Sequence, residues 1–393
     1  MTDDFIDKAI DDCIDKVSKL LNKNLFEEDK EEICEKELPD EWILQKCREI
    51  EDEDYEEDEK RNGYHRVEYV DGAVYEGEWK DGMRDGIGKY IYETGDEYIG
   101  EWKEDAINGE GRYKWADGGV YEGSWKNYLK HGKGKFDCGD GTVYEGYFKE
   151  DERSGFGRET YPDNSYYEGE WKNDMKNGHG KYVWDKGTFC ECEFKDDFPN
   201  GKGKWIHAGG DSYEGDFKDG LKDGFGKYTY ANGDFYEGEW KDDNKNGHGK
   251  YTYTDGDVYE GEFRDDLRNG FGKYISSNGE IYEGEYKDDL RNGFGKVQFP
   301  NGDVYCGEFG NEMFNGHGVY TWSDGRIYEG EFVDDLSEGW GKQTYRNGNV
   351  YEGEWKNDIQ NGYGKLINAK GKVLYDGEWE NGRKKRKRRA KND

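Results

Sequence analysis

The segment Tyr75-Glu76-Gly77-Glu78-Trp79-Lys80 decides the fold of this chain, because close variants of it recur at a fixed interval. Each unit also carries a Gly-x-Gly triplet such as Gly86-Ile87-Gly88, and most units end near an Asn-Gly or Asp-Gly pair. The interval is 23 residues, and fourteen units follow one another with a single-residue insertion before the last. Repetition on this scale indicates a chain built from stacked copies of one small structural unit.

The local pattern predicts that each unit is a β-hairpin. Alternation places Tyr75, Gly77 and Trp79 on one face of a strand and the charged residues between them on the other. Residues 88–92 alternate in the same way and form the second strand. The Asn-Gly or Asp-Gly pair supplies the positive φ values of a tight turn, and the Gly-x-Gly triplet is expected to form a loop with a similar need.

The overall composition alone would predict a disordered chain. The net charge is −34, hydrophobic residues make up only 32%, and the mean hydropathy is −1.30. However, 60 glycines and many aromatic residues (33 Tyr, 18 Phe and 13 Trp) stand largely in register with the repeat, which disordered chains do not show. No apolar signal core or membrane-length segment is found, and the seven cysteines lack a disulfide spacing, so we expect a cytoplasmic protein with free thiols.

The repeated pattern resembles the MORN (membrane occupation and recognition nexus) repeat over residues 66–382. The resemblance implies an elongated, gently twisted antiparallel sheet. Members of the family include radial spoke head proteins of cilia, cytoskeletal scaffolds of protists, junctophilins, and arrays attached to lipid kinase or SET-domain modules. This sequence departs from the pattern at Cys190 and Cys192, which replace the Tyr and Gly of the sixth unit, and at Asn164, which replaces a turn glycine.

We therefore predict an all-β fold: an elongated single-layer antiparallel sheet of about 14 stacked 23-residue hairpins, preceded by a short acidic α-helical segment. The predicted parts are an amphipathic helical segment (1–50), an acidic linker (51–65), the repeat array (66–382) and a basic tail (383–393). The helical segment is interpreted either as a docking or dimerisation helix or as a cap over the first sheet edge. Its apolar face carries Ile6, Ile10, Cys13, Val17 and Leu20.

The aromatic face of the sheet is the first candidate binding surface. A single-layer sheet leaves this face open unless the sheet curls or something lies on it. We predict a trough that accepts a protein partner, a second copy or a segment of this chain; the alternative is that curling alone packs the rings. The predicted partner-binding residues are Tyr75, Trp79, Tyr98, Trp102, Tyr121, Trp125, Tyr213, Tyr236, Trp240, Tyr259, Tyr351 and Trp355.

The basic tail is the second candidate surface. The repeats carry a large negative charge that would repel an anionic bilayer, so affinity for anionic phospholipid is placed in the tail. Nuclear import and contact with an acidic protein surface, including head-to-tail contact with another copy, are alternatives, and nucleic acid is not expected. The predicted anion-binding residues are Arg383, Lys384, Lys385, Arg386, Lys387, Arg388 and Arg389.

No catalytic, metal-binding or cofactor-binding residues are predicted. The recurring Gly-x-Gly-Lys lacks the Ser or Thr and the following helix of a phosphate loop. His179, His248 and His317 are three units apart, and Cys190 and Cys192 supply only half of a zinc site. The predicted function is a non-catalytic elongated scaffold for protein–protein interaction in a cytoskeletal or ciliary assembly. The alternative is a membrane-associated tether or phosphoinositide or lipid-kinase regulator that binds anionic lipid through the tail.

Overall fold

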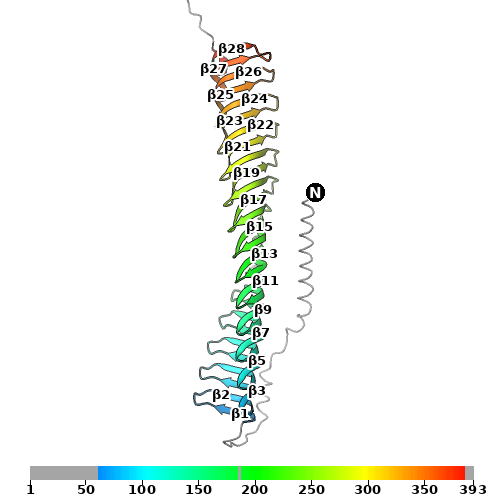
Figure 1. Cartoon of the computed structure of the whole chain (residues 1–393), viewed down its shortest axis with the longest axis vertical. Coiled ribbons are helices and arrows are strands. Elements are labelled where there is room, and N and C mark those ends of the chain that lie inside the picture. Colours follow the sequence, from blue (N-terminus) through cyan, green and yellow to red (C-terminus); the bar gives the residue numbers. More distant parts are fainter. Residues whose placement is uncertain (1–60, 185–186, 386–393) are drawn as a thin grey trace, which may run out of the picture.

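The computed structural model describes residues 61–184 and 187–385, which form one sheet of 29 β-strands without an α-helix. Each strand pairs in antiparallel fashion with the next along the chain, from β1 to β29. Figure 1 shows the resulting long, narrow stack, which twists gently along its length. The predicted all-β fold of stacked hairpins is confirmed. The predicted N-terminal helix lies outside the described residues.

The strands follow the 23-residue period. The first strands of the units are β2 (Val74–Lys80), β4 (Glu97–Lys103), β6 (Val120–Lys126), β8 (Val143–Lys149), β10 (Tyr166–Lys172), β12 (Phe189–Lys195), β14 (Ser212–Lys218), β16 (Phe235–Lys241), β18 (Val258–Arg264), β20 (Ile281–Lys287), β22 (Val304–Gly310), β24 (Ile327–Val333), β26 (Val350–Lys356) and β28 (Val373–Glu380). The second strands are β3 (Met83–Ile91), β5 (Ala106–Lys114), β7 (Leu129–Asp137), β9 (Glu152–Thr160), β11 (Met175–Val183), β13 (Phe198–Ile206), β15 (Leu221–Thr229), β17 (Asn244–Thr252), β19 (Leu267–Ile275), β21 (Leu290–Gln298), β23 (Met313–Thr321), β25 (Leu336–Thr344) and β27 (Ile359–Ile367).

Two short strands extend the array beyond its predicted limits. β1 (Gly63–Glu68) begins inside the segment predicted to be linker and pairs with β2. β29 (Arg383–Lys384) begins inside the predicted basic tail and pairs with β28. The sheet therefore uses residues at both ends of the described region as additional edge strands.

Two kinds of turn connect the strands. Within a unit, Asp242-Asp243 forms a two-residue turn with φ values of 47° and 69°, as a type I′ hairpin requires. Between units, Gly233 alone has a positive φ (93°), and its N–H donates to the carbonyl of Tyr230 at 2.8 Å. The predicted positive φ is thus confirmed at the glycine of the Asn-Gly pair. In the unit without that glycine, Asn164 adopts a φ of 66°.

The Gly-x-Gly triplet lies in the second strand, so its prediction as a loop was wrong. In β17, Gly247 has a φ of 94° where the ladder between β16 and β17 shifts register. Gly249 pairs with Gly238 of β16, and the side chain of Tyr236 lies across this glycine pair. A Cβ atom added to Gly249 would stand 2.3 Å from the Tyr236 hydroxyl, too close for any side chain. The second glycine is therefore required by packing, and the first by backbone conformation.

The aromatic rings form a continuous core along the inner face, defined here as the face that carries Tyr236 and Trp240. Tyr236 meets Trp240 of its own strand edge to face at 5.2 Å and Phe263 of the next unit at 5.0 Å. The Tyr236 hydroxyl donates to the carbonyl of Glu239 at 2.9 Å, and the Trp240 indole donates to the carbonyl of Gly226 at 3.0 Å. Tyr236 and Trp240 thus each join their unit to a neighbour and have their polar atoms satisfied.

The sixth unit replaces this arrangement with a pair of thiols. Cys190 stands in the place of the tyrosine, and Cys192 in the place of the glycine two residues later, which is Gly238 in the unit of Tyr236. Both cysteine side chains are buried. Their sulfur atoms lie 2.7 Å apart, and the hydrogen bond between the thiols, together with burial, raises the pKa of Cys192. Cys192 remains paired with Gly203 of β13, so the sheet continues through this unit. Both cysteines are free thiols, as are Cys138 and Cys306.

Substituting Gly249→Ala should destabilise the array, because the new methyl group must displace the Tyr236 ring. Overpacking of this kind costs about 1–3 kcal/mol. Hydrogen exchange should show lost protection in β16, β17 and β18, and the melting temperature should fall. Lys250→Ala, one residue away on the exposed face, is the matched control and should leave both unchanged. Equal protection in the two variants would contradict the packing role of the glycine.

The sixth unit offers a test by double substitution. Cys190→Tyr alone should destabilise the chain, because the new ring would meet the side chain of Cys192 where other units have glycine. Cys192→Gly alone should leave a gap above the glycine pair. The double variant should be more stable than the two single effects predict, by roughly 1 kcal/mol or more, as expected for residues in contact. Strict additivity in thermal or denaturant unfolding would contradict this interpretation.

Candidate functional site

The structure buries the aromatic residues that were predicted to bind a partner. The predicted tyrosines, from Tyr75 to Tyr351, are no more than 1% exposed, and the tryptophans of this set are 3–7% exposed. The expectation of an open trough at these residues was therefore wrong. Edge-to-face packing between units and the close approach of each tyrosine to its glycine pair cover the rings without a partner.

A row of cations completes the cover of the inner face. The Arg153 guanidinium lies 4.2 Å from the centre of the Trp171 ring, and its Nε atom is 3.0 Å from the Asp174 carboxylate. The backbone N–H of Arg153 donates to the same carboxylate at 2.8 Å. Asp174 belongs to the type I′ turn of the next unit, so this contact ties neighbouring units together. Equivalent cations over the rings are Arg84, Lys130, Lys176, Lys222, Lys245, Arg268 and Arg291.

Burial determines the ionisation of the inner face. Desolvation raises the pKa of Tyr92 to about 12 and lowers the pKa of Lys130, Lys176 and Lys245. The tyrosine is therefore neutral at physiological pH, since its pKa lies far above that pH. A neutral, packed ring is suited to a structural role and offers no base for catalysis.

On the outer face, defined as the opposite face of the sheet, one column consists of paired charges. Lys273 of β19 lies 2.6 Å from Glu283 of β20, and Lys181 of β11 lies 3.4 Å from Glu191 of β12. Similar pairs recur along the array, and their side chains are about half exposed. Such pairs contribute little energy each, and their charges largely cancel within the column.

A second column on the outer face consists of exposed rings and carboxylates. Its rings occupy the middle position of the Gly-x-Gly triplet, and each is paired across strands with a glutamate. Phe225, Phe271, Phe294, Trp340 and Tyr363 are 52–60% exposed. We call this set the ring–carboxylate column: Phe225, Glu239, His248, Glu262, Phe271, Glu285, Phe294, Glu308, His317, Glu331, Trp340, Glu354, Tyr363 and Glu378.

The backbone holds the carboxylates of this column in place. Glu239 accepts the N–H of His248 at 3.0 Å, and Glu354 accepts the N–H of Tyr363 at 2.9 Å. These N–H groups become available because the ladder shifts register beside the first glycine of each triplet. Each glutamate therefore stands between the ring of its own unit, as His248 does for Glu239, and the ring of the preceding unit, as Phe225 does, which makes the column continuous.

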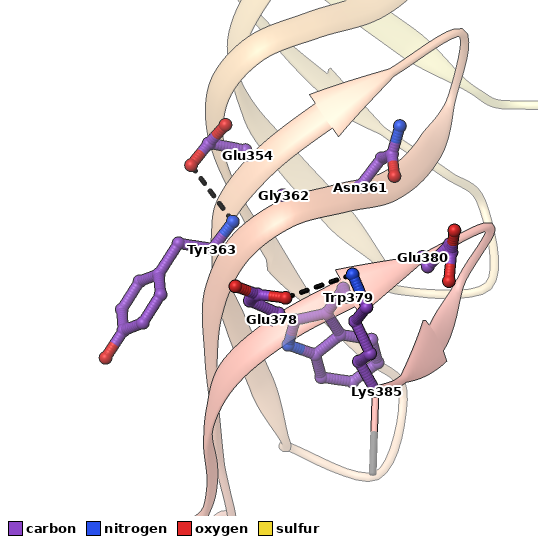
Figure 2. Close-up of a pocket in the computed structure, with 8 residues that line it drawn as sticks. All are labelled: Glu354, Asn361, Gly362, Tyr363, Glu378, Trp379, Glu380 and Lys385. Atoms are coloured by element: carbon purple, nitrogen blue, oxygen red, sulfur yellow. Dashed lines mark hydrogen bonds and ion pairs between the residues drawn. The ribbon is translucent and has the colours of Figure 1, made fainter. Parts of the chain in front are cut away.

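At the C-terminal edge, the start of the basic tail meets the last members of this column. The Lys385 ammonium is 3.1 Å from the Glu378 carboxylate, and the N–H of Lys385 donates to the carbonyl of Glu378 at 2.9 Å. Figure 2 shows this ion pair beside Tyr363, whose ring points away from the ribbon. The hollow at this edge is lined by Glu354, Asn361, Gly362, Tyr363, Glu378, Trp379, Glu380 and Lys385.

The remaining predicted residues fall into two groups. Arg383, Lys384 and Lys385 lie at the edge just described, where Lys384 also approaches the rings of Tyr375 and Trp379. Arg386, Lys387, Arg388 and Arg389 lie outside the described residues, as do Ile6, Ile10, Cys13, Val17 and Leu20. Their assignment to anion binding and to helix docking stays a prediction.

Sequence reasoning missed both the inner row of cations and the ring–carboxylate column. Arg153 and its equivalents recur nine residues after the tyrosine position, and the rings of the column recur twelve residues after it. Both signals were present in the period. These positions were missed because the Gly-x-Gly triplet was assigned to a loop. In a strand, the middle residue of the triplet lies on a defined face of the sheet.

The described residues offer neither a metal site nor a membrane-spanning helix. Nowhere in 61–184 and 187–385 do three or more His, Cys, Asp or Glu side chains gather closely enough to hold a metal ion. The same residues contain no helix with the length and apolar character needed to cross a membrane.

Comparison of the sequence with known protein families finds MORN repeats along nearly the whole described array. The matched segments are 75–97, 98–120, 121–143, 144–166, 167–189, 193–212, 213–235, 236–258, 259–281, 282–304, 305–325, 328–350, 351–373 and 375–385. The search of curated proteins gives no match.

Solved structures offer only distant likenesses. The TCP10 domain of Danio rerio CPAP is 14% identical, with 56% of this chain and 98% of that chain covered and a TM-score of 0.30. The Drosophila melanogaster SAS-4 (dCPAP) TCP domain, solved in complex with a proline-rich motif of Ana2, is 17% identical, with 45% and 90% covered and a TM-score of 0.24. A streptogramin B lyase is 14% identical, with 62% and 81% covered and a TM-score of 0.13. These likenesses are too weak to support a functional argument.

Proposed function

Because the chain belongs to the MORN repeat family, we propose that it is a non-catalytic scaffold that holds protein partners in a cytoskeletal or ciliary assembly. The observation that carries the proposal is the unbroken sheet. Its 29 strands, at about 4.8 Å each, give a body on the order of 130 Å long. A body of this shape is suited to spacing partners along its length.

The distribution of burial and charge supports a role in binding proteins. The inner face is filled by its own rings and cations, so partners are left with the outer face and the two ends. The outer face exposes large aromatic side chains in five of the seven units from Phe225 to Tyr363, and the other two units carry histidines at the same position. Exposed aromatic rings arranged in this way are typical of protein-binding surfaces.

A membrane tether or lipid regulator remains the alternative proposal. It depends on the cluster of cations from Arg383 onward, each worth about 1 kcal/mol near an anionic surface. In the described part of the tail, Lys384 lies against the rings of Tyr375 and Trp379 and Lys385 is paired with Glu378. Contact with lipid would compete with these internal contacts, so the scaffold is the function that the geometry supports best.

Fractionation of cells tests the two proposals against each other. The full chain should stay with the detergent-insoluble cytoskeletal fraction after membranes are extracted, because its anchors are proteins. A variant in which Arg383–Arg389 are replaced by glutamine is the control and should distribute in the same way. Release of the full chain by detergent, together with loss of membrane association in the glutamine variant, would contradict the scaffold and favour the tether.

A further inference from the structure

We propose that the ring–carboxylate column binds an extended, arginine- or lysine-rich segment of a partner protein that carries a cation at about every third residue. This inference deepens the proposed function, since it names the surface and the chemistry of a partner of the scaffold. It rests on three features of the column: its charge, its exposed rings and its spacing.

The charge of the column favours a cationic ligand. Seven glutamates, from Glu239 to Glu378, follow one another at single-unit intervals. Among the described residues, Lys385 is the one lysine or arginine within ion-pair distance of any of them, and it meets only Glu378. In the neighbouring column of paired charges, lysines of the chain itself neutralise the glutamates. The glutamates of the ring–carboxylate column are therefore the ones that a cation from a partner can reach.

The rings add a preference for Arg and Lys over other cations. Phe271, Phe294 and Trp340 each leave more than half of the side chain exposed, beside a carboxylate. Elsewhere on the outer face the chain itself places cations over rings, since Arg158 lies 3.9 Å from the centre of the Tyr166 ring and Lys227 lies 4.4 Å from that of Phe235. Arg158 is also 3.9 Å from the Glu168 carboxylate. A cation from a partner could therefore contact a ring face and a carboxylate at once.

The spacing of the column determines the form of the ligand. Equivalent rings stand two strands apart, or about 9.6 Å. Three residues of a polyproline II segment advance about 9.3 Å, and three residues of an extended strand about 10 Å. A cation at every third residue of such a segment therefore meets one ring and one carboxylate per unit. Seven rings therefore need a segment of about 20 residues.

Lys385 shows how such a cation is held. Its ammonium lies on Glu378, which is the cross-strand partner of Tyr363, at the C-terminal end of the column. The other members, from Phe225 to Glu354, have the same cross-strand pairing of a ring with a glutamate. The first three units lack this pattern, because Ile87, Glu110 and Lys133 occupy the ring position there, whereas Phe156 and His179 of the next two units pair with Glu170 and Glu193.

That difference supplies a matched control within the chain. The test variant is F271T/F294T/W340T, and the control variant is I87T/E110T/K133T at the equivalent positions of the first half. Both sets are on second strands, where Ile87 is half-buried and the other five residues are exposed, and neither changes the net charge. Circular dichroism of the full-length variants should match that of the unsubstituted chain, which separates binding from folding.

The probe is a fluorescein-labelled (Arg-Pro-Pro)7 peptide, and binding to the full chain is followed by fluorescence anisotropy. We expect the test variant to bind at least about tenfold more weakly than the unsubstituted chain, while the control variant stays within about twofold. A peptide of the same composition with all seven arginines at one end should also bind about tenfold more weakly, because it cannot place its cations in register.

Three results would overturn the proposal. They are equal binding by the test variant, equal binding of the clustered peptide, and self-association of the chain that the test substitutions abolish without any peptide binding. The last result would mean that a second copy covers the column. If the peptide does not bind while the chain stays in the cytoskeletal fraction, the proposed scaffold function is retained and only the assignment of the ring–carboxylate column is wrong. If the peptide binds but the chain is released from the cytoskeletal fraction, the assignment of the ring–carboxylate column is retained and the cytoskeletal or ciliary assembly is wrong.

Discussion

The structure depends on one repeated contact, in which a tyrosine ring lies across a pair of glycines on adjacent strands. Tyr236 approaches the backbone of Gly238 and Gly249 so closely that neither position can carry a side chain. The contact turns the ring inward and lets the aromatic residue four positions later pack against the tyrosines of two units. Because the same contact recurs in nearly every unit, a chain with only 32% hydrophobic residues can still build a continuous core.

Because of this contact, the two faces of the sheet have different roles: the inner face packs the core and the outer face is open to solvent. The inner face satisfies itself with rings, with hydrogen bonds from tyrosine hydroxyls and indoles, and with a row of cations such as Arg153 that tie one unit to the next. The outer face has no structural need for large rings, yet it displays them in five of the seven units from Phe225 to Tyr363. Exposed rings that the fold does not require are the features we assign to partner binding, and the high negative charge around them selects cationic partners.

Much of the fold could be predicted from the period, because alternation and turn glycines report directly on hairpins. The same alternation correctly predicted which side chains near Tyr236 lie on the aromatic face of the sheet. The main error was the assignment of Gly247 and Gly249 to a loop, because both lie in β17. A glycine in a sequence does not show why it is needed: Gly247 is needed for its positive φ, and Gly249 for the close approach of the Tyr236 ring. That error hid the outer rings. The coverage of the inner face was also beyond sequence reasoning, because it depends on how closely a ring can approach backbone in three dimensions.

The most direct test of the account is small-angle X-ray scattering of the full chain in solution. If ring-over-glycine packing joins every unit to the next, the scattering should be that of a rod with a constant cross-section and a longest dimension on the order of 130 Å or more. A compact particle, or a chain that bends freely at the Cys190 unit, would contradict the claim that one contact, repeated without a break, holds the whole array.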